Sequence, residues 1–309
     1  MELRQLRSFL AVIECGSFSR AAEKIGVTQQ AISRNILTLE SAVGAQLVER
    51  DKRVACPTPL GKVLVMYANN ILAEADGFQR KVEDMLAASG GRVRLGSSPT
   101  AAIELVSEAV LSLNRDRDDI RLDVIAGALP AAADALMHGE MDLFVGIDNG
   151  AGDYEGLERE VFATELYCVV AGKQHPLAHA AHVSAQDLCD SEWIIGKHLG
   201  LVEAGWRAAF TSRGLDCPTP KITTTSLDFC KNILMSSPFL SVLPRQLVGS
   251  EIENGNLSCL NLDGFSWERP IALFYRRNTT FNDAISSTIE ALRQAAGKYR
   301  RLLACQPVG

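Results

Sequence analysis

The chain has 309 residues, of which 47% are hydrophobic and 22% are charged. This length predicts two or three folded domains, and this composition excludes wholesale disorder. No run of about 18 uncharged apolar residues occurs, so we expect no membrane span. The start, Met1-Glu2-Leu3-Arg4, is not typical of a signal peptide. Eight scattered cysteines without a CxxC pair indicate reduced thiols, and together these features predict a cytoplasmic protein.

Charge is distributed unevenly along the chain. Residues 1–62 contain nine Lys/Arg and six Asp/Glu, which gives a net charge of +3. Since the whole chain carries −6, the remainder carries −9. A basic N-terminal part on an acidic body predicts a polyanionic partner for the N-terminal part alone.

The first 44 residues contain three segments whose apolar residues recur at three- and four-residue steps, which predicts three helices. The first ends at Gly16, and the second follows a cap at Ser17 or Ser19 and ends at Gly26. Thr28 is placed to cap the third. The side chains expected to face inward are Ala21, Ala22 and Ile25 in the second helix, and Ile32, Ile36, Leu39 and Val43 in the third.

Two helices joined by so short a turn form a helix-turn-helix. In such a unit the N-terminal residues of the second helix meet base edges in the major groove. After Thr28, that end carries Gln29, Gln30, Ser33 and Arg34, whose side chains suit hydrogen bonding to bases and phosphates. The alternative is that these residues form an ordinary solvated helix face. For a helix pair without further evidence, this alternative is favoured.

The segment that follows favours the DNA-binding interpretation. Arg50, Lys52 and Arg53 lie in a short turn between two strand-like pieces. A basic hairpin beside a helix-turn-helix is a wing, which can reach phosphates or an adjacent minor groove. Thr58 then caps a new helix that has Pro59 at its first position.

This N-terminal pattern resembles the winged helix-turn-helix of LysR-type transcriptional regulators over nearly all of residues 1–62. The positions that carry the resemblance are Phe9, Gly16, Ser17, Phe18, Ala21, Ala22, Thr28, Gln29, Ser33, Ile36, Leu39, Glu40, Gly44, Leu47, Arg50, Arg53, Thr58, Pro59 and Gly61. The resemblance implies that Gln29, Ser33 and Arg34 contact DNA from the recognition helix and that Arg53 contacts it from the wing.

A long helix is predicted next, because apolar residues alternate at mostly four- and three-residue steps over about 28 residues. Its apolar seam comprises Leu60, Leu64, Tyr67, Ile71, Ala75, Phe78, Val82 and Met85. The alternative is a core helix of one domain, but the break Ser89-Gly90-Gly91 favours a free connector. LysR-type regulators have a linker helix that pairs two subunits, so the resemblance implies a homodimer or homotetramer.

The remainder alternates predicted strands and helices, which is typical of parallel sheets covered by helices. Two α/β units are expected, the first interrupted by the second, with crossings near Thr164 and near Gly264. This pattern is similar to the effector domain of LysR-type regulators, which resembles periplasmic solute-binding proteins. The predicted fold is therefore α/β with an N-terminal all-α winged helix-turn-helix (1–58), a linker helix (59–89) and a two-lobed periplasmic-binding-protein-like effector domain (90–309; lobe I 91–163 and 265–301, lobe II 164–264).

Open α/β sheets bind ligands beyond the carboxyl ends of their strands. At the first such end, hydroxyls stand where a helix begins with free N–H groups, which favours an anion. Alternatively, Ser98 or Thr100 only caps that helix. By strand order, the resemblance gives ten candidate effector residues: Ser97, Ser98, Pro99, Thr100, Ile147, Asp148, Gly196, Lys197, Thr225 and Phe239. We expect a small-molecule effector, an anionic metabolite, that binds in the cleft between the two lobes and modulates DNA binding.

Redox sensing through Cys189 and Cys217 is the alternative, because some LysR-type proteins sense peroxide in this region. Three acidic residues lie close to Cys189 in the sequence and would raise its pKa, whereas a sensor thiol needs a lowered one. Free cysteines are more often small buried hydrophobes. Small-molecule sensing is therefore favoured.

Enzyme activity is the least favoured interpretation, since GxSxG, Walker and GxGxxG patterns are absent from the sequence. His175, His179 and His182 have helical spacing, but Pro176 interrupts them, so neither a metal nor a cofactor is expected. The expected partners are a double-stranded DNA operator, a small-molecule effector, further copies of the chain and RNA polymerase, with no membrane.

Overall fold

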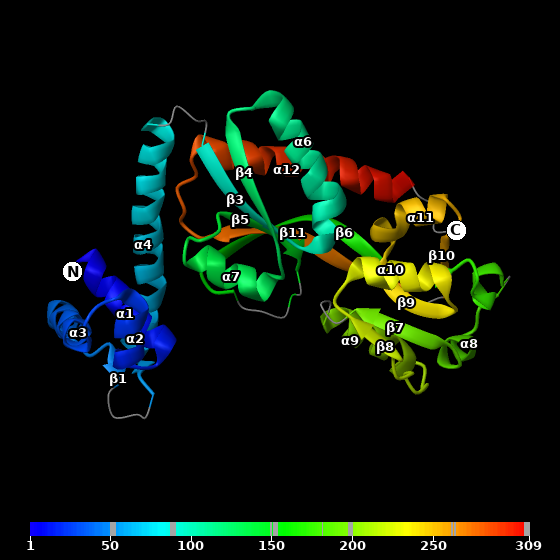
Figure 1. Cartoon of the computed structure of the whole chain (residues 1–309), viewed down its shortest axis with the longest axis horizontal. Coiled ribbons are helices and arrows are strands. Elements are labelled where there is room, and N and C mark those ends of the chain that lie inside the picture. Colours follow the sequence, from blue (N-terminus) through cyan, green and yellow to red (C-terminus); the bar gives the residue numbers. More distant parts are fainter. Residues whose placement is uncertain are drawn as a thin grey trace.

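The computed structural model describes residues 1–49, 54–86, 91–148, 150, 154–180, 182–196, 200–260, 262 and 264–305. Figure 1 shows a small helical part at the N-terminus, one long helix (α4) beside it, and two α/β lobes beyond. We call the N-terminal part the head. The expected α/β architecture with an all-α winged helix-turn-helix is confirmed.

Three helices form the head: α1 (Leu3–Cys15), α2 (Phe18–Ile25) and α3 (Gln29–Val43). The Ser17 side chain accepts a hydrogen bond from Arg20 N, so Ser17 caps α2, and Thr28 caps α3 as predicted. The turn between α2 and α3 needs a left-handed residue, and Gly26 supplies it at φ 70°. These short caps and turns hold the two helices of the motif close together.

The head core confirms most of the inward-facing predictions. Ala21, Ala22, Ile32, Ile36 and Leu39 are all buried. The prediction was wrong for two residues, because Ile25 is 37% exposed and Val43 is 40% exposed. Each is the last residue of its helix, where the chain turns away and leaves no neighbouring element to cover the side chain.

Two short antiparallel strands, β1 (Val48–Glu49) and β2 (Cys56–Pro57), form the base of the wing. The basic residues predicted for its turn, Arg50, Lys52 and Arg53, lie outside the described residues. Helix α4 (Pro59–Leu86) follows, and the Thr58 hydroxyl accepts a hydrogen bond from Gly61 N at 3.0 Å. The predicted cap and the proline at the first helical position are therefore confirmed.

Helix α4 has both buried and exposed apolar side chains. Ala68 and Ala73 are buried, and Ile71 packs partly against the head core. Tyr67 is 61% exposed and Phe78 is 70% exposed. Leu60, Val63 and Val82 are also exposed. Four side chains of the predicted seam, Leu60, Tyr67, Phe78 and Val82, are thus exposed in one copy of the chain, whereas Leu64 and Ile71 meet the head.

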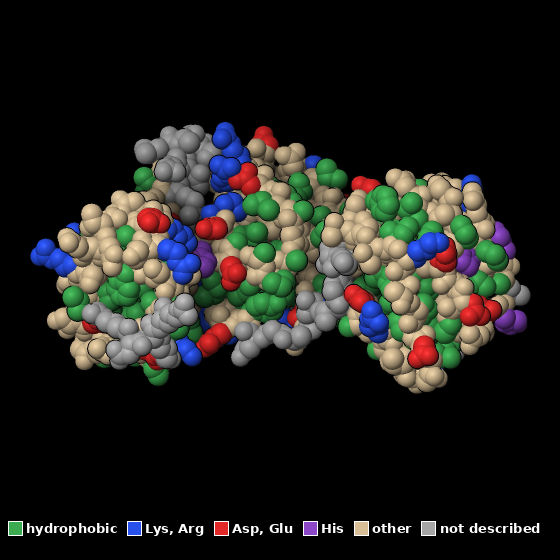
Figure 2. Space-filling model, turned by 60° about the horizontal axis from the view of Figure 1, so that its bottom comes forward, with side chains coloured by type: hydrophobic (Ala, Val, Ile, Leu, Met, Phe, Trp, Pro, Cys, Tyr) green, Lys and Arg blue, Asp and Glu red, His purple; other side chains and the backbone are tan. Residues whose placement is uncertain are grey.

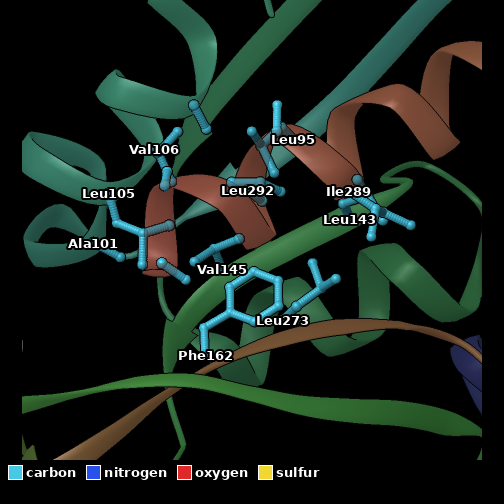
Figure 3. Packing of buried hydrophobic residues seen from close by; sticks show 14 of the residues in the cluster. Leu95, Ala101, Leu105, Val106, Leu143, Val145, Phe162, Leu273, Ile289 and Leu292 are labelled. Carbon is cyan, nitrogen blue, oxygen red and sulfur yellow. The ribbon is translucent and has the colours of Figure 1, made fainter. Parts of the chain in front are cut away.

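Lobe I begins with a βαβαβ unit, which agrees with the predicted alternation of strands and helices. Its elements are β3 (Gly91–Ser97), a helical run of α5 (Pro99–Ala101), η1 (Ala102–Val106) and α6 (Ser107–Asp116), then β4 (Ile120–Ala126), α7 (Leu129–Met137) and β5 (Leu143–Ile147). The C-terminal helix α12 (Asp283–Cys305) completes the lobe. Figure 3 shows its core, where side chains of the strands interlock with those of the helical run and α12.

Lobe II contains the second predicted α/β unit and four elements that were not predicted. Its elements are η2 (Pro176–His179), α8 (Ala185–Cys189), β7 (Glu192–Gly196), α9 (Gly200–Thr211), β8 (Ile222–Thr224), α10 (Leu227–Ser236), β9 (Phe239–Pro244), η4 (Arg245–Val248), α11 (Gly249–Glu253) and β10 (Leu257–Leu260). The additions are the short helices η2, η4 and α11 and strand β10. Trp193, Trp206 and Phe210 are fully buried at the centre of a core separate from that of lobe I.

Two long strands, β6 (Leu157–Gly172) and β11 (Trp267–Arg276), join the lobes. They pair antiparallel, with Thr164 opposite Pro270. The described strands outside the wing follow the order β4-β3-β5-β11-β6-β9-β7-β8, with β10 also paired to β6. The sheet is thus continuous from one lobe into the other. Among the described residues, no helix is both long and apolar enough to cross a bilayer.

Candidate DNA-binding and effector sites

Helix α3 presents its polar N-terminal end to solvent. Gln29, Gln30 and Arg34 are exposed, and Ser33 is half-buried. The Thr28 hydroxyl accepts from Ala31 N at 3.2 Å, which fixes the first turn of the helix. These predicted DNA-contacting residues therefore lie together on one accessible end of a capped helix.

The opposite side of α3 is anchored within the head. Its apolar residues are buried, and Asn35 Nδ2 donates to Ser8 Oγ of α1 at 2.9 Å. Ser19 of α2 donates to Gln29 Oε1 at 2.9 Å, which ties the two helices of the motif. Because these contacts fix the orientation of α3, its exposed end is held rigidly to the rest of the head.

Glu40 connects α3 to the wing, a role that the sequence analysis missed. It is buried, and its Oε1 accepts from Leu47 N at 2.9 Å and from Val48 N at 3.3 Å. Hydrogen bonds to a carboxylate are stronger than neutral ones, so they hold the first wing strand against the recognition helix. The sequence signal for this role is that Glu40 is an acidic residue at a position of the helical pattern where a buried side chain is expected.

The end of strand β3 brings together four of the predicted effector residues. Ser97 is buried, and its hydroxyl donates to Ser98 O at 3.0 Å. Ser98 Oγ accepts from Ala101 N at 3.3 Å and lies 3.2 Å from Thr100 Oγ1. Ser98 therefore caps the helix that begins at Pro99, and Thr100 is left as a buried hydroxyl beside it.

At the end of β5, Ile147 and Asp148 point to different surroundings. Ile147 is buried in the lobe I core. The Asp148 carboxylate bonds Arg159 Nη1 at 2.8 Å and Gly150 N at 3.0 Å. Asp148 also lines a surface pocket of about 260 Å³, together with Tyr154, Glu155, Leu157, Arg159, Phe274 and Arg277.

In lobe II, the remaining predicted residues lie at strand ends. Gly196 ends β7, Thr225 is exposed after β8, and Phe239 is half-buried at the start of β9. The ammonium of Lys221 lies 5.8 Å from the centre of the Phe239 ring. Lys197, predicted to approach from this lobe, lies outside the described residues.

A buried carboxyl group stands where the two lobes join. Glu165 of β6 is 1% exposed and pairs in register with Arg269 of β11. Burial raises the pKa of Glu165 to about 7, while the Thr100 hydroxyl and the charge of Arg269 act in the opposite direction. Glu165 therefore carries a proton through much of the range below neutral pH.

Two polar atoms of this cluster have no hydrogen-bond partner within the part of the chain that the structure describes: Glu165 Oε2 and Tyr167 Oη. The Tyr167 ring stacks on Trp267 at 6.0 Å between ring centres, and the Arg269 guanidinium lies 5.8 Å from the Tyr167 ring centre. Burial also raises the pKa of Tyr167. Buried polar groups are nearly always satisfied, so these two atoms need a partner that the described chain does not supply, such as a bound ligand or an ordered water.

The helix that starts beside this cluster is irregular. Residues 102–106 form a π-helical turn, and the Ser107 hydroxyl donates to Ala102 O at 2.7 Å. Such π-turns occur often at functional sites. The sequence carried a signal for the cluster, because Glu165 is the one acid in an otherwise apolar predicted strand, but only the fold places it beside Thr100 and Arg269.

The cysteines considered for redox sensing lie in unfavourable surroundings for a sensor. Burial raises the pKa of Cys189, and Asp190 and Asp216 raise it further. Burial also raises the pKa of Cys217. A raised pKa lowers the thiolate fraction that reacts with peroxide.

Two of the three histidines with helical spacing make local hydrogen bonds. His175 accepts from Leu177 N at 3.1 Å, and His179 Nε2 lies 2.9 Å from Lys173 O. Within the described ranges, no group of three His, Cys, Asp or Glu side chains is placed to hold a metal.

Comparison with known proteins matches the chain in two places. Residues 3–62 match the bacterial regulatory helix-turn-helix protein, lysR family, and residues 87–297 match the LysR substrate binding domain. The HTH-type transcriptional regulator GbpR of Azospirillum brasilense is 26% identical over 310 residues, which cover 98% of this chain and 89% of GbpR. CysL of Bacillus subtilis is 24% identical, over 87% of this chain and 89% of CysL.

Solved structures agree on the fold. ArgP from Mycobacterium tuberculosis has a TM-score of 0.66 and 21% identity, covering 94% of this chain and 96% of ArgP. LysG from Corynebacterium glutamicum, solved with its effector Arg bound, has a TM-score of 0.63 and 17% identity, covering 96% of this chain and 99% of LysG. Because the two matched domains take in most of the sequence, the chain belongs to the LysR family: it is an effector-responsive, DNA-binding transcriptional regulator and not an enzyme.

Proposed function

We propose that the effector is a small molecule with an anionic group, and that this group binds beside Ser98, Thr100, Glu165 and Tyr167. The observation that carries the proposal is the pair of buried polar atoms without partners, Glu165 Oε2 and Tyr167 Oη. They lie next to the hydroxyls at the end of β3, a strand end of the kind where open α/β sheets bind ligands.

The chemistry of this cluster suits a carboxylate. A carboxylic acid that keeps its proton near neutral pH donates a hydrogen bond, as does a phenol or an alcohol. Glu165, Tyr167, Ser98 and Thr100 thus offer several O–H donors to one anion. Arg269 adds a positive charge next to them. Gly196, Lys197, Thr225 and Phe239 complete the proposed site from lobe II.

Metabolite binding tests this proposal. We expect a carboxylate among a panel of mono- and dicarboxylic acids and amino acids to raise the unfolding temperature of the wild-type chain. Thr100→Val and Tyr167→Phe should each weaken its binding about fivefold, because one hydrogen bond contributes about 1 kcal/mol. Isothermal titration would measure the change, with Thr211→Val and Tyr275→Phe as matched controls. Unchanged affinity in both cleft variants would exclude this site.

For DNA, we infer that α3 enters the major groove with Gln29, Gln30, Ser33 and Arg34 toward the bases. Thr28 caps the end of α3 that would enter the groove. The exposure of this end and its anchoring to α1 and α2 support the inference. The wing residues Arg50, Lys52 and Arg53 would reach the adjacent backbone or minor groove.

Arg34→Ala should weaken operator binding and leave the fold intact, because Arg34 is exposed on α3. A lost base contact corresponds to about 1–3 kcal/mol, whereas a lost phosphate contact lowers the slope of affinity against salt by about one. Fluorescence anisotropy over a salt series would distinguish them, using a duplex that the wild type selects from random-sequence DNA. Arg115→Ala removes the same charge from lobe I and should bind normally. Wild-type affinity for Arg34→Ala at every salt concentration would show that the recognition face is misplaced.

LysR-type regulators oligomerise, and we propose that α4 makes the contact between copies. The uncovered side chains of Tyr67 and Phe78 support this, since a second copy of the helix would bury them. The resulting homodimer or homotetramer would place two heads on one operator. We infer that it works in the cytoplasm and meets RNA polymerase at the promoter.

A further inference from the structure

The end of helix α7 makes a close contact with the linker helix. Gly139 follows α7 with φ 68°, and a Cβ added there would lie 2.7 Å from the Cβ of Ala73 in α4. Ala73 is fully buried. The main chain of lobe I therefore approaches α4 more closely than a side chain at position 139 would permit.

Arg276 strengthens this contact and links it to a strand that joins the lobes. It is buried on β11, its Nη1 donates to Leu136 O at 3.3 Å, and its Nη2 donates to Glu74 Oε1 of α4 at 3.1 Å. Gly139 O also accepts from Arg94 of β3 at 2.6 Å. The end of α7 is thus fixed to the sheet of lobe I and to the linker helix together.

The same turn reaches the head through His138. Its Nε2 lies 2.8 Å from Glu14 Oε1 of α1, and its Nδ1 lies 2.7 Å from Asp134 O of α7. Both ring nitrogens face oxygen acceptors, so the imidazolium donates to both, whereas the neutral ring has one N–H. Figure 2 shows histidine atoms beside basic side chains at the boundary between the head and the middle of the molecule.

Glu14 also contacts the helix-turn-helix. Its other oxygen, Oε2, bonds Lys24 Nζ of α2 at 2.5 Å, and this carboxylate raises the pKa of Lys24. Helix α2 is bonded in turn to α3 through Ser19 and Gln29. A continuous set of contacts therefore runs from the end of α7 to the recognition helix.

We propose that His138 is a positioning residue for DNA binding: by holding Glu14 and Lys24, it sets the orientation of the head relative to α4 and lobe I. A shift of lobe I would then change the direction in which α3 is presented. With two heads per dimer, a fixed orientation makes the protein sensitive to the distance between half-sites on DNA. The proposal does not depend on which effector binds.

The test compares two duplexes, the operator selected by the wild type and the same operator with its half-sites moved apart by about half a helical turn. We expect the wild type to bind the second duplex about tenfold or more weakly, because one head then faces the wrong side of the DNA. His138→Ala should bind both with less than about threefold difference, because its heads can reorient. His138→Gln keeps a donor for Glu14 and should restore at least part of the discrimination.

His179→Ala is the matched control, since it removes a lobe II histidine bonded only to a backbone carbonyl in the described contacts. It should discriminate like the wild type. If His138→Ala retains wild-type discrimination, the contact does not position the head. If His138→Ala weakens both duplexes equally and lowers the unfolding temperature of the head, the contact is structural. Either result overturns the proposal, and neither bears on the effector site.

Discussion

Above pH 7, the Glu165→Gln variant is expected to be more stable than the wild type by about 3 kcal/mol. Burial between the lobes raises the pKa of Glu165 from 4.5 to about 7. Each unit of pKa difference between the folded and the unfolded chain corresponds to about 1.36 kcal/mol, so ionisation of this carboxyl group lowers the free energy of unfolding. Glutamine has nearly the same shape and no charge to bury.

The pH dependence has a definite sign. Below pH 4.5 the carboxyl group is protonated in both the folded and the unfolded chain, so its ionisation contributes nothing to the difference between them. Between pH 4.5 and about 7 the folded chain keeps the proton and the unfolded chain loses it, so the free energy of unfolding falls as pH rises. Above about pH 7 the loss is complete.

Urea unfolding of the wild type and Glu165→Gln from pH 5 to pH 8.5 would measure this difference, since effects of all other groups are common to both. Glu268→Gln is the control, because Glu268 is exposed on the neighbouring strand β11. Its curve should run parallel to that of the wild type. Parallel curves for Glu165→Gln as well would show that Glu165 ionises normally in the folded protein.

Gly61→Ala should disrupt the head and reduce operator binding by about tenfold or more. A Cβ at Gly61 would lie 2.1 Å from Leu47 O, which already accepts a hydrogen bond from Thr58 N at 3.0 Å. The Leu47 carbonyl has little freedom to move, because Glu40 holds Leu47 N. The start of α4 and the wing must therefore separate, at about 1–3 kcal/mol or more.

Circular dichroism melting and the selected operator duplex would measure both effects. Gly297→Ala is the control, since Gly297 lies inside α12 and an added Cβ meets no atom of the described chain within 4 Å. It should stabilise the protein by up to about 1 kcal/mol, because alanine favours helix more than glycine. A stable Gly61→Ala variant with normal operator affinity would contradict the close packing of α4 against the wing.

Local patterns predicted the head and most of the lobes because each of those elements has a complete signal of its own. Thr28 as a cap and Gly26 as a left-handed turn residue act within a few positions of the sequence. The first half of β6 was missed for the opposite reason. Glu158, Arg159 and Glu160 lie before the strand that the sequence predicted, yet in the fold they belong to β6 and pair with Arg277, Asp148 and Arg293, respectively.

In the candidate effector site too, residues with a local signal were predicted and a residue without one was missed. Ser98 and Thr100 were predicted, because a strand end followed by a helix start is visible in the sequence. Glu165 was not, since its burial depends on Arg269, more than 100 residues later, and on the meeting of two separate cores. Ile25 and Val43 have the periodicity of core residues, but helical periodicity does not show where the neighbouring elements end.

The division of lobe I into two separated segments has a consequence for synthesis on the ribosome. Strand β5 pairs with β11, and the core around Val145 is closed by Leu292 of α12, so lobe I cannot be completed until nearly the whole chain has emerged. The head and α4 are local in sequence, and lobe II lies almost entirely between β6 and β11. Both can form earlier, since domains generally fold as units during translation. The nascent chain therefore carries β3, β4 and β5 with an uncovered apolar face for the time needed to translate more than 100 residues, and this part of the molecule is where we expect chaperones to bind.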